Sequence, residues 1–261
     1  NLAMTQKNPT VLVDLNLQSG DLELLLGLKP KFSLADVVEN RDRLDDALLA
    51  SYITPHSKNL SLLAAPVKAE SAEDIEPKHI YEVMELLPQR YDNVFVDTPH
   101  NFDSVTISAL HHAEQILVVL TLEIHAIRST RRALEIFDRL GYPRKKVKLV
   151  VNRWSKNIEL DQKQVEDFLG ERVIAFIQSD YRAAVNSINL GQPLIASAPG
   201  STVTADLHTL AGKLFGDTVE YSAPAVGGKR PFNSLFRKSS ATMQDLGLNA
   251  ALERANLGAV Q

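Results

Sequence analysis

The sequence predicts an α/β protein built on a doubly wound, mainly parallel sheet with helices on both faces. Two observations support this prediction. Apolar runs of strand length alternate with amphipathic stretches of helix length from residue 10 to about residue 215. The apolar runs are continuous and rich in Val, Ile and Leu, which is typical of parallel strands buried on both faces. Such alternation implies right-handed crossovers between neighbouring strands.

Six segments are expected to form the strands of this sheet. They are residues 10–15, 60–65, 93–98, 115–121, 147–152 and 172–177. Ligands of doubly wound sheets bind beyond the carboxyl ends of the strands. The residues that directly follow each strand are therefore the candidates for a functional site.

Helix signals separate these strands. The segment "SLADVVEN" begins with Ser33, a residue type that caps helix N-termini. In "EPKHIYEVMELLPQR", Pro77 stands in the expected first turn. The segment "AIRSTRRALEIFDRLGY" reaches Gly141, a typical stop at a helix C-terminus.

Composition narrows the class of protein. The chain has 261 residues, a hydrophobic fraction of 44% and a formal net charge of −4, so no global basic field attracts nucleic acid. It has no cysteine, which excludes disulfides, thiolate metal sites and a cysteine nucleophile. The histidines form no metal-binding HExxH pattern, and no signal peptide or apolar run of about 20 residues is visible. We expect a soluble, cytoplasmic protein.

The chain divides into two predicted regions. Residues 1–216 are expected to form one domain that is incomplete at its N-terminus, because "NLAMTQKN" reads as the end of a helix that stops at Pro9. Residues 217–261 read as a linker or tail with a possible short final helix. Within the tail, "KRPFNSLFRK" places three apolar side chains on one helical face among four cations. Disorder and docking on a membrane or partner both remain open for it.

Polar side chains follow three of the predicted strands. Asp14 and Asp97 each end a buried strand, and Asn152 ends a third. A carboxylate in this position suits the water shell of a nucleotide-bound Mg²⁺, although it equally suits a cap of the next helix. An asparagine amide both donates and accepts hydrogen bonds and can read the edge of a purine base.

These motifs resemble a known family. The segments "VLVDLNLQSGDLELLLGL", "YDNVFVDTPHNFDSVTISALHHAEQILVVLTLEIHAIRSTRRALEIFDRLGY", "VKLVVNRW" and "SDYRAAVNSINLGQPLI" together resemble the MinD/ParA superfamily of P-loop ATPases. More narrowly, they resemble its CpaE/TadZ branch, which assembles Flp (tight-adherence) pili. The resemblance implies a P-loop NTPase fold of the deviant Walker A group, whose first strand and phosphate loop lie outside this sequence.

The resemblance assigns ATP and Mg²⁺ as cofactors and gives three residues a role. Asp97 matches the Walker B aspartate that holds Mg²⁺ through water, and Asn152 matches the asparagine that contacts adenine. Asp180 lies in the loop that closes over the base, where Gln178 stands in place of the usual proline.

The expected catalytic turn contains Asp14 and Asn16. Asn16 stands where the family has an aspartate that orients the attacking water. An asparagine can hold a water, but it lacks the charge that helps activate it. Asparagine is also favoured in turns for local reasons, so a neutral exchange stays open beside a loss of hydrolysis.

Three functions follow from the resemblance. The first is an ATPase that forms a homodimer around ATP and recruits pilus assembly and secretion proteins at the cell pole, with possible contact to the inner-membrane surface. The second is a hydrolysis-deficient scaffold, or pseudo-ATPase, of the same fold. The third, a ParA-like DNA partitioning protein, needs a basic surface. The basic clusters at 128–132 and 144–146 are expected to be solvated faces, so nucleic acid is not an expected partner.

Overall fold

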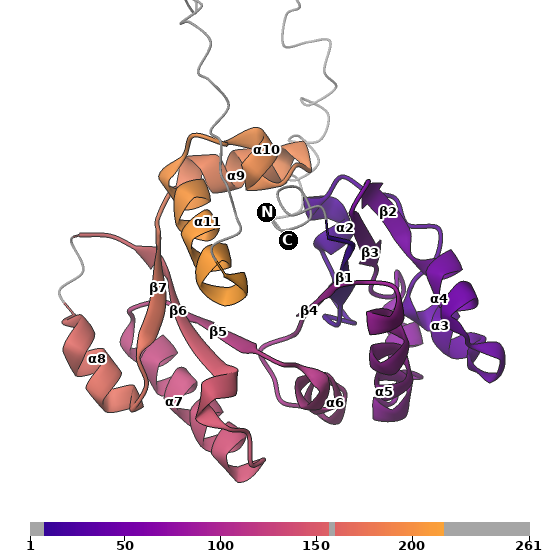
Figure 1. Ribbon diagram of the computed structural model, residues 1–261, viewed down its shortest axis with the longest axis horizontal. Helices are drawn as coiled ribbons and strands as arrows, with labels where there is room; N and C mark the ends of the chain where they lie inside the picture. The colour runs from indigo at the N-terminus through magenta and orange to yellow at the C-terminus, as the bar shows by residue number, and fades with distance from the viewer. Residues whose placement is uncertain (1–7, 157–159, 217–261) are drawn as a thin grey trace, which may run out of the picture. The chain divides into compact units, whose positions relative to one another are not determined.

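The computed structural model describes residues 8–156 and 160–216, and Figure 1 draws them in colour. The strands are β1 (Thr10–Asp14), β2 (Thr54–Ser57), β3 (Leu60–Leu63), β4 (Asn93–Asp97), β5 (Ile116–Leu120), β6 (Val147–Trp154) and β7 (Val173–Gln178). Each of the six predicted strands is present, and β2 was not predicted. The tail segment 217–261 and the expected helix end at 1–7 lie outside the described residues.

Ten helices are seen in the described residues, together with four short 3-10 turns. The helices are α2 (Leu22–Leu25), α3 (Leu34–Glu39), α4 (Asp46–Tyr52), α5 (Pro77–Leu86), α6 (Ser104–His112), α7 (Ile124–Arg139), α8 (Gln162–Leu169), α9 (Tyr181–Leu190), α10 (Leu194–Ser197) and α11 (Thr202–Phe215). Ser33 forms a capping box with Asp36, and Pro77 is the first residue of α5. Gly141, at a φ of 76°, follows the end of α7. The three predicted helix signals are thus confirmed.

The strands form two sheets. The first has the order β2-β3-β1-β4, and the second has the order β5-β6-β7. All neighbouring strands pair in parallel except β2, which runs antiparallel to β3 at an outer edge. The mainly parallel, doubly wound α/β class is therefore confirmed. Within the described residues, however, β4 and β5 follow one another in the chain without a ladder between them.

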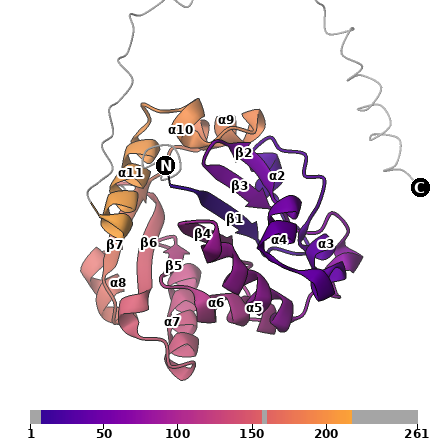
Figure 2. The same cartoon turned by 45° about the vertical axis from the view of Figure 1, so that its right-hand side comes forward.

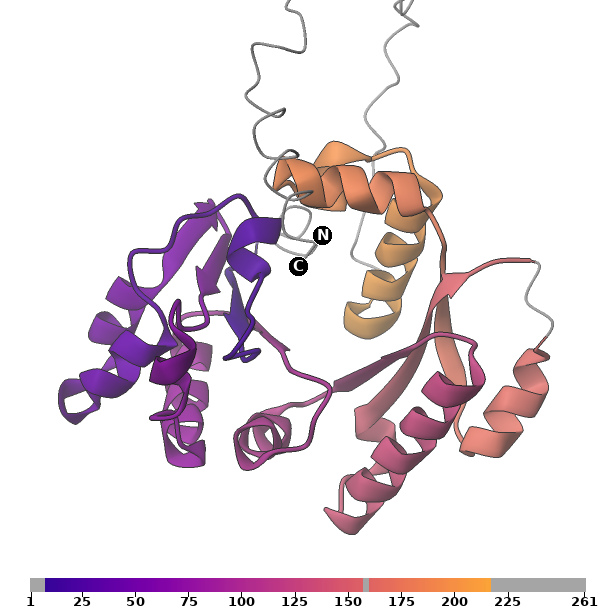
Figure 3. The same cartoon turned by 180° about the vertical axis from the view of Figure 1, so that it is seen from behind.

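Helices cover both faces of the strands. Helices α5 to α8 lie on one side, and α9 to α11 lie on the other (Figures 1 and 3). The turned view in Figure 2 shows the same separation, with α10 and α11 opposite α6 and α7. This arrangement follows from the crossovers, because each helix that joins two parallel strands must return over a face of the sheet.

Each sheet has its own core. Val11 and Val13 of β1 pack with Leu34 of α3 and Ile80 of α5 in the first core. Leu149 and Val151 of β6 pack with Leu134 of α7 and Leu169 of α8 in the second. These side chains are at most 1% exposed. Complete burial of one such side chain contributes about 1.5–3 kcal/mol to folding, so both halves have substantial cores.

The facing edges of β4 and β5 are less well covered. No residue of β4 is fully buried, although its sequence NVFVD is largely apolar. On β5, Leu117 is 37% exposed and Val119 is 60% exposed. A cavity of about 500 Å³ is lined by residues of both sheets and of the helices above them, including Leu12, Phe95, Leu117, Leu207 and Phe215. An apolar strand edge in this state has room for further packing.

A contact between two glycines joins the halves on the side of α9. Gly27, after α2, and Gly191, after α9, both have positive φ, at 63° and 57°. A Cβ on Gly191 would lie 2.8 Å from the Cα of Gly27, closer than real side chains come. Only glycine combines this backbone conformation with so close an approach.

Candidate functional site

The two predicted aspartates lie side by side at the ends of neighbouring strands. Asp14 and Asp97 are direct partners in the β1–β4 ladder. The backbone N–H of Leu15 donates to the carbonyl oxygen of Asp97 over 2.8 Å, which continues the pairing beyond the strands. The sheet register therefore brings these two carboxylates to one place.

Asp14 is tied to the turn that follows it. Its side chain is fully buried, at 0% exposure. Oδ1 accepts a hydrogen bond from the Asn16 N–H over 3.0 Å, and Oδ2 accepts one from the Leu22 N–H over 3.2 Å. A Cβ on Gly20 would lie 2.7 Å from Oδ2, so the turn wraps closely around the carboxylate. Asp14 thus fixes the course of residues 15–22.

Asp97 is the more available carboxylate. The residue is exposed, and within residues 8–156 and 160–216 its carboxylate accepts no hydrogen bond. Partial desolvation raises its pKa, and the negative charge of Asp14 raises it further. Burial likewise raises the pKa of Asp14, although its hydrogen bonds from backbone N–H groups act in the opposite direction. Among the described residues, no cation offsets this pair.

Two carboxylates in this state fit a hydrated Mg²⁺. Mg²⁺ prefers oxygen ligands, keeps several waters and is bound through one or two carboxylates together with substrate phosphates. In the described part of the chain, no group of three or more His, Cys, Asp or Glu side chains is placed to hold a metal. Asp97 is the residue that would hold the cation through water.

Asn16 lies in the turn that Asp14 organises. Its Nδ2 donates to the carbonyl oxygen of Ser19 over 3.1 Å, and its Oδ1 accepts from the Ser19 hydroxyl over 3.2 Å. Both the nitrogen and the oxygen of the Asn16 amide therefore bind Ser19 and stabilise the turn. This contact gives Asn16 a local structural role besides the predicted role at the attacking water.

The other two predicted residues lie near the ends of strands of the second sheet. Asp180 follows β7 and caps α9, because its Oδ1 accepts from the Ala183 N–H over 3.0 Å. Asn152 is exposed near the end of β6, and its Oδ1 accepts from the N–H of Arg153 over 2.8 Å. Gln178 donates its backbone N–H to Asp206 over 2.8 Å. The side chains of Asp180 and Asn152 are thus fixed by contacts with the backbone that follows them.

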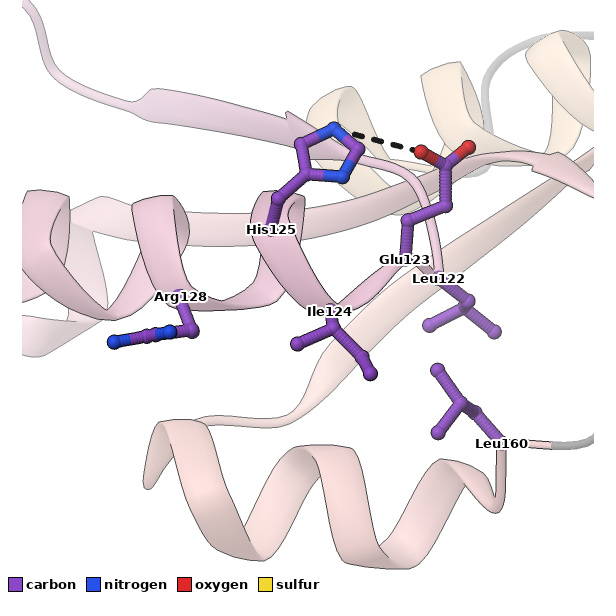
Figure 4. A pocket seen from close by; sticks show the side chains of 6 residues that line it. All are labelled: Leu122, Glu123, Ile124, His125, Arg128 and Leu160. Carbon is purple, nitrogen blue, oxygen red and sulfur yellow. Dashed lines mark ion pairs between the residues drawn. The ribbon is translucent and has the colours of Figure 1, made fainter.

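The sequence did not single out a pocket that follows β5. The pocket measures about 800 Å³ and is lined by Leu122, Glu123, Ile124, His125, Arg128 and Leu160. Leu122 and Leu160 point toward one another, and His125 forms an ion pair with Glu123 over 3.4 Å (Figure 4). Ile124 is 70% exposed. The only signal for this pocket in the sequence was its place after a strand.

The basic clusters are engaged in local contacts. Arg131 donates to Glu135 and to the carbonyl oxygen of Phe168. Arg144, in the short 3-10 turn before β6, forms ion pairs with Asp138 and Glu171. These contacts support the interpretation of the two clusters as solvated faces. In the ranges that the structure covers, no helix has both the length and the apolar character needed to cross a bilayer.

Comparison with known proteins agrees with the fold. Residues 3–149 match the family described as an AAA domain. The chain is 32% identical over 193 residues to a putative septum site-determining protein MinD of Oltmannsiellopsis viridis, which covers 71% of this chain and 59% of that protein. The chain therefore spans about three fifths of that relative's length.

Two solved structures resemble the fold. A ParA family ATPase from Chlorobium tepidum superposes with a TM-score of 0.76 at 26% identity, covering 80% of this chain and 89% of that one. The septum site-determining protein MinD of Pyrococcus horikoshii, solved with Mg-ADP, superposes with a TM-score of 0.70 at 21% identity and covers 82% and 86%. The fold is therefore that of the α/β ATPases of the ParA and MinD type. The chain belongs to the MinD/ParA family of P-loop ATPases.

Proposed function

We propose that this protein is a pilus-assembly ATPase, which dimerises around ATP and Mg²⁺ at the cell pole and recruits Flp-type secretion proteins. The observation that supports the nucleotide part is the paired Asp14 and Asp97 at the ends of β1 and β4. The pilus part rests on the resemblance of the strand-end motifs to the CpaE/TadZ branch.

The described residues have different roles in the proposed nucleotide site. Asp97 would hold Mg²⁺ through water, and Asp14 holds the turn beside it. Asn152 and Asp180 belong to the base side of the site. When bound, Mg²⁺ would supply the neutralisation of phosphate charge that phosphoryl transfer requires. The relative from Pyrococcus horikoshii was solved with Mg-ADP, which supports the same cofactor here.

The open edges of β4 and β5 support one further part of this proposal. The family resemblance implies a further strand between β4 and β5, followed by a phosphate loop, outside residues 1–261. The exposed Leu117 and Val119 and the adjoining cavity leave room for it. Because loop amides and a helix N-terminus supply most phosphate contacts, residues 1–261 alone should bind ATP weakly. A micromolar dissociation constant for this chain by calorimetry would contradict this part.

A hydrolysis-deficient scaffold is the second candidate, and Asn16 favours it. Its amide lacks the negative charge of the family's aspartate and is engaged with Ser19 at both ends. In that case ATP binding and dimerisation remain, while turnover is slow. A DNA partitioning role is disfavoured by the local pairing of Arg131 and Arg144. A salt-dependent DNA shift assay tests that third role, and binding at physiological salt would favour it.

The test compares the full-length protein with Asp97→Asn. Light scattering after gel filtration should show a dimer with ATP and Mg²⁺ for the wild type and a monomer for the variant. Hydrolysis measured on the same samples separates the enzyme from the scaffold. A wild type that stays monomeric at saturating Mg-ATP would refute ATP-dependent dimerisation.

The cellular part needs its own measurement. In a host that makes Flp-type pili, a fluorescent fusion should form a polar focus that disperses with Asp97→Asn. Pilus secretion proteins should co-purify with the wild type and not with the variant. A uniform wild-type signal through the cell, or a focus at mid-cell, would instead favour the septum-site role given in the name of the relative from Oltmannsiellopsis viridis.

A further inference from the structure

The pocket after β5 has an apolar wall that lies partly in solvent. Leu122, Ile124 and Leu160 converge on it from the end of β5, from the first turn of α7 and from the segment before α8 (Figure 4). Leu122 is buried, whereas Ile124 is 70% exposed. A concave site with apolar walls of this kind is suited to receive an apolar side chain of another molecule.

A row of arginines extends from this pocket along α7. Arg128 lines the pocket, and Arg132 and Arg139 follow it at intervals of four and seven residues. Residues at these intervals lie on one face of a helix, and Ile124, one turn before Arg128, lies on the same face. All three arginines are exposed. The pocket and the arginine row, Arg128, Arg132 and Arg139, therefore form one continuous surface.

The acidic residues of α7 do not neutralise this row. Its two acids, Glu135 and Asp138, already pair with arginines outside the row. Among the described residues, the side chains of the three arginines in the row form no ion pair or hydrogen bond. Like charges at helical spacing repel one another. The row therefore favours a partner that brings negative charge.

The pocket distinguishes between the possible anionic partners. A flat layer of lipid headgroups would leave the pocket empty, and a nucleic acid would place a charged backbone against its apolar wall. A protein helix offers both components, because an apolar side chain and carboxylates at intervals of four residues share one face. The rise of α7 separates Arg128 from Arg132 by about 6 Å, and carboxylates at i and i+4 of a partner helix are separated by the same distance.

We propose that this surface of α7 docks an acidic amphipathic helix of a partner protein. The partner inserts one aliphatic side chain into the pocket and directs carboxylates to the arginine row. The anchored side chain supplies affinity, whereas the exposed charge pairs mainly supply orientation and a faster association rate. No residue of this surface belongs to the proposed nucleotide site, so the inference holds or fails independently of the proposed function.

The chemistry of the partner is tested by selection on the full-length protein from a phage library of random peptides as long as α7, 16 residues. The enriched sequences should carry an aliphatic residue and acids at helical spacing. Enrichment of basic or uncharged sequences, or no enrichment, would overturn the proposal. Binding of the protein to vesicles that contain phosphatidylglycerol, without any enriched peptide, would assign the surface to a membrane instead.

The position is tested with an enriched peptide and the double variant Arg128→Glu with Arg132→Glu. The variant should weaken the peptide about tenfold or more, and added salt should weaken binding to the wild type. A peptide whose acids are changed to lysine should bind the double variant better than the wild type. Equal affinity of the enriched peptide for wild type and double variant would place it elsewhere and overturn the proposal.

Two further variants separate the pocket from a general effect of charge. Ile124→Ser removes part of the apolar wall and should weaken the peptide while keeping the salt dependence. Lys58→Glu with Lys68→Glu reverses the same number of exposed charges outside the surface and should leave the affinity unchanged. All these side chains are exposed, so every variant should keep the Tm of the wild type. Equal weakening by the lysine control would show that net charge, and not this surface, binds the peptide.

Discussion

The two sheets end in different chemistry. Strands β1 and β4 end in Asp14 and Asp97, two carboxylates paired in one ladder, and the first of them is fully buried. Asn152 lies near the end of β6, and Asp180 follows β7; each side chain is fixed by a hydrogen bond from the backbone that follows it. Asp14 and Asp97 concentrate negative charge that no described cation offsets. Asn152 and Asp180 are held in fixed orientations and do not bring two carboxylates together. The first end is therefore suited to a cation, and the second to an uncharged base.

The largest effect is expected at Asp14. Asp14→Ala removes the acceptor for the N–H groups of Asn16 and Leu22. Each unsatisfied buried donor costs about 1–3 kcal/mol, and relief of the buried charge returns part of that. We expect a net loss of about 2–4 kcal/mol in urea unfolding. Asp14→Asn keeps one acceptor and should lose less, and a loss below about 0.5 kcal/mol for Asp14→Ala, typical of a neutral surface site, would remove Asp14 from its structural role.

The glycine contact between α2 and α9 is the next most sensitive feature. Gly191→Ala adds a Cβ 2.8 Å from Gly27 and strains the backbone. We expect a loss of about 1–3 kcal/mol. Gly141→Ala is the matched control, because Gly141 also has positive φ but has nothing within 4 Å of the added Cβ. Equal losses in the two variants would show that the close approach contributes nothing.

Asn16→Asp tests the catalytic difference from the family. The added charge should raise the steady-state rate of ATP hydrolysis by the full-length protein about tenfold or more, since general-base assistance is worth this much. KM should change little, because such a group acts in the transition state. Ser19→Ala loosens the same turn without adding charge and should not raise the rate. An unchanged rate in Asn16→Asp would favour the local turn role of Asn16.

Asp97→Asn should stabilise the protein slightly. It removes the desolvation cost of the Asp97 charge and its repulsion with Asp14, and because Asp97 itself is exposed we expect a gain of up to about 1 kcal/mol. The pKa of Asp97 is raised above 3.8 in the folded state, so the folded protein binds more protons than the unfolded chain. Stability of the wild type therefore falls as pH rises from 3.8 to the folded pKa, and it is constant above that.

The Tm of Asp97→Asn should therefore exceed that of the wild type by an amount that increases as pH rises through this window. Above the window, the difference in Tm should stay constant. Thermal unfolding between pH 3.5 and pH 7.5, a span chosen about the ordinary carboxyl pKa of about 4, measures it. An advantage that shrinks with pH would mean that the Asp97 carboxylate stabilises the fold.

Local signals predicted most of the fold. The six strands, the capping Ser33 and the stop at Gly141 are encoded by nearby residues, so the sequence alone indicates them. Strand β2 escaped prediction because it is short, contains Pro55 and lies at an edge, where no continuous apolar run is needed. The separation of β4 from β5 depends on pairing between distant segments, which periodicity does not report.

The site was predicted by residue type and not by contact. A strand end identified Asp14 and Asp97, but only the register shows that they face one another. Asn152 was chosen because its amide donates and accepts, and only the structure shows that its oxygen also accepts the N–H of Arg153. The pocket after β5 carries no motif, since it depends on Leu160 meeting Leu122 across a long sequence separation.

The division of roles between the two carboxylates is tested most directly by the Mg²⁺ dependence of ATP affinity. The measurement compares full-length wild type, Asp97→Asn and Asp14→Asn across a Mg²⁺ titration. We expect Mg²⁺ to tighten ATP binding in the wild type and in Asp14→Asn, and to have no effect in Asp97→Asn, although that variant is folded at least as stably. Retained Mg²⁺ dependence in Asp97→Asn, or its loss in Asp14→Asn alone, would contradict the assignment.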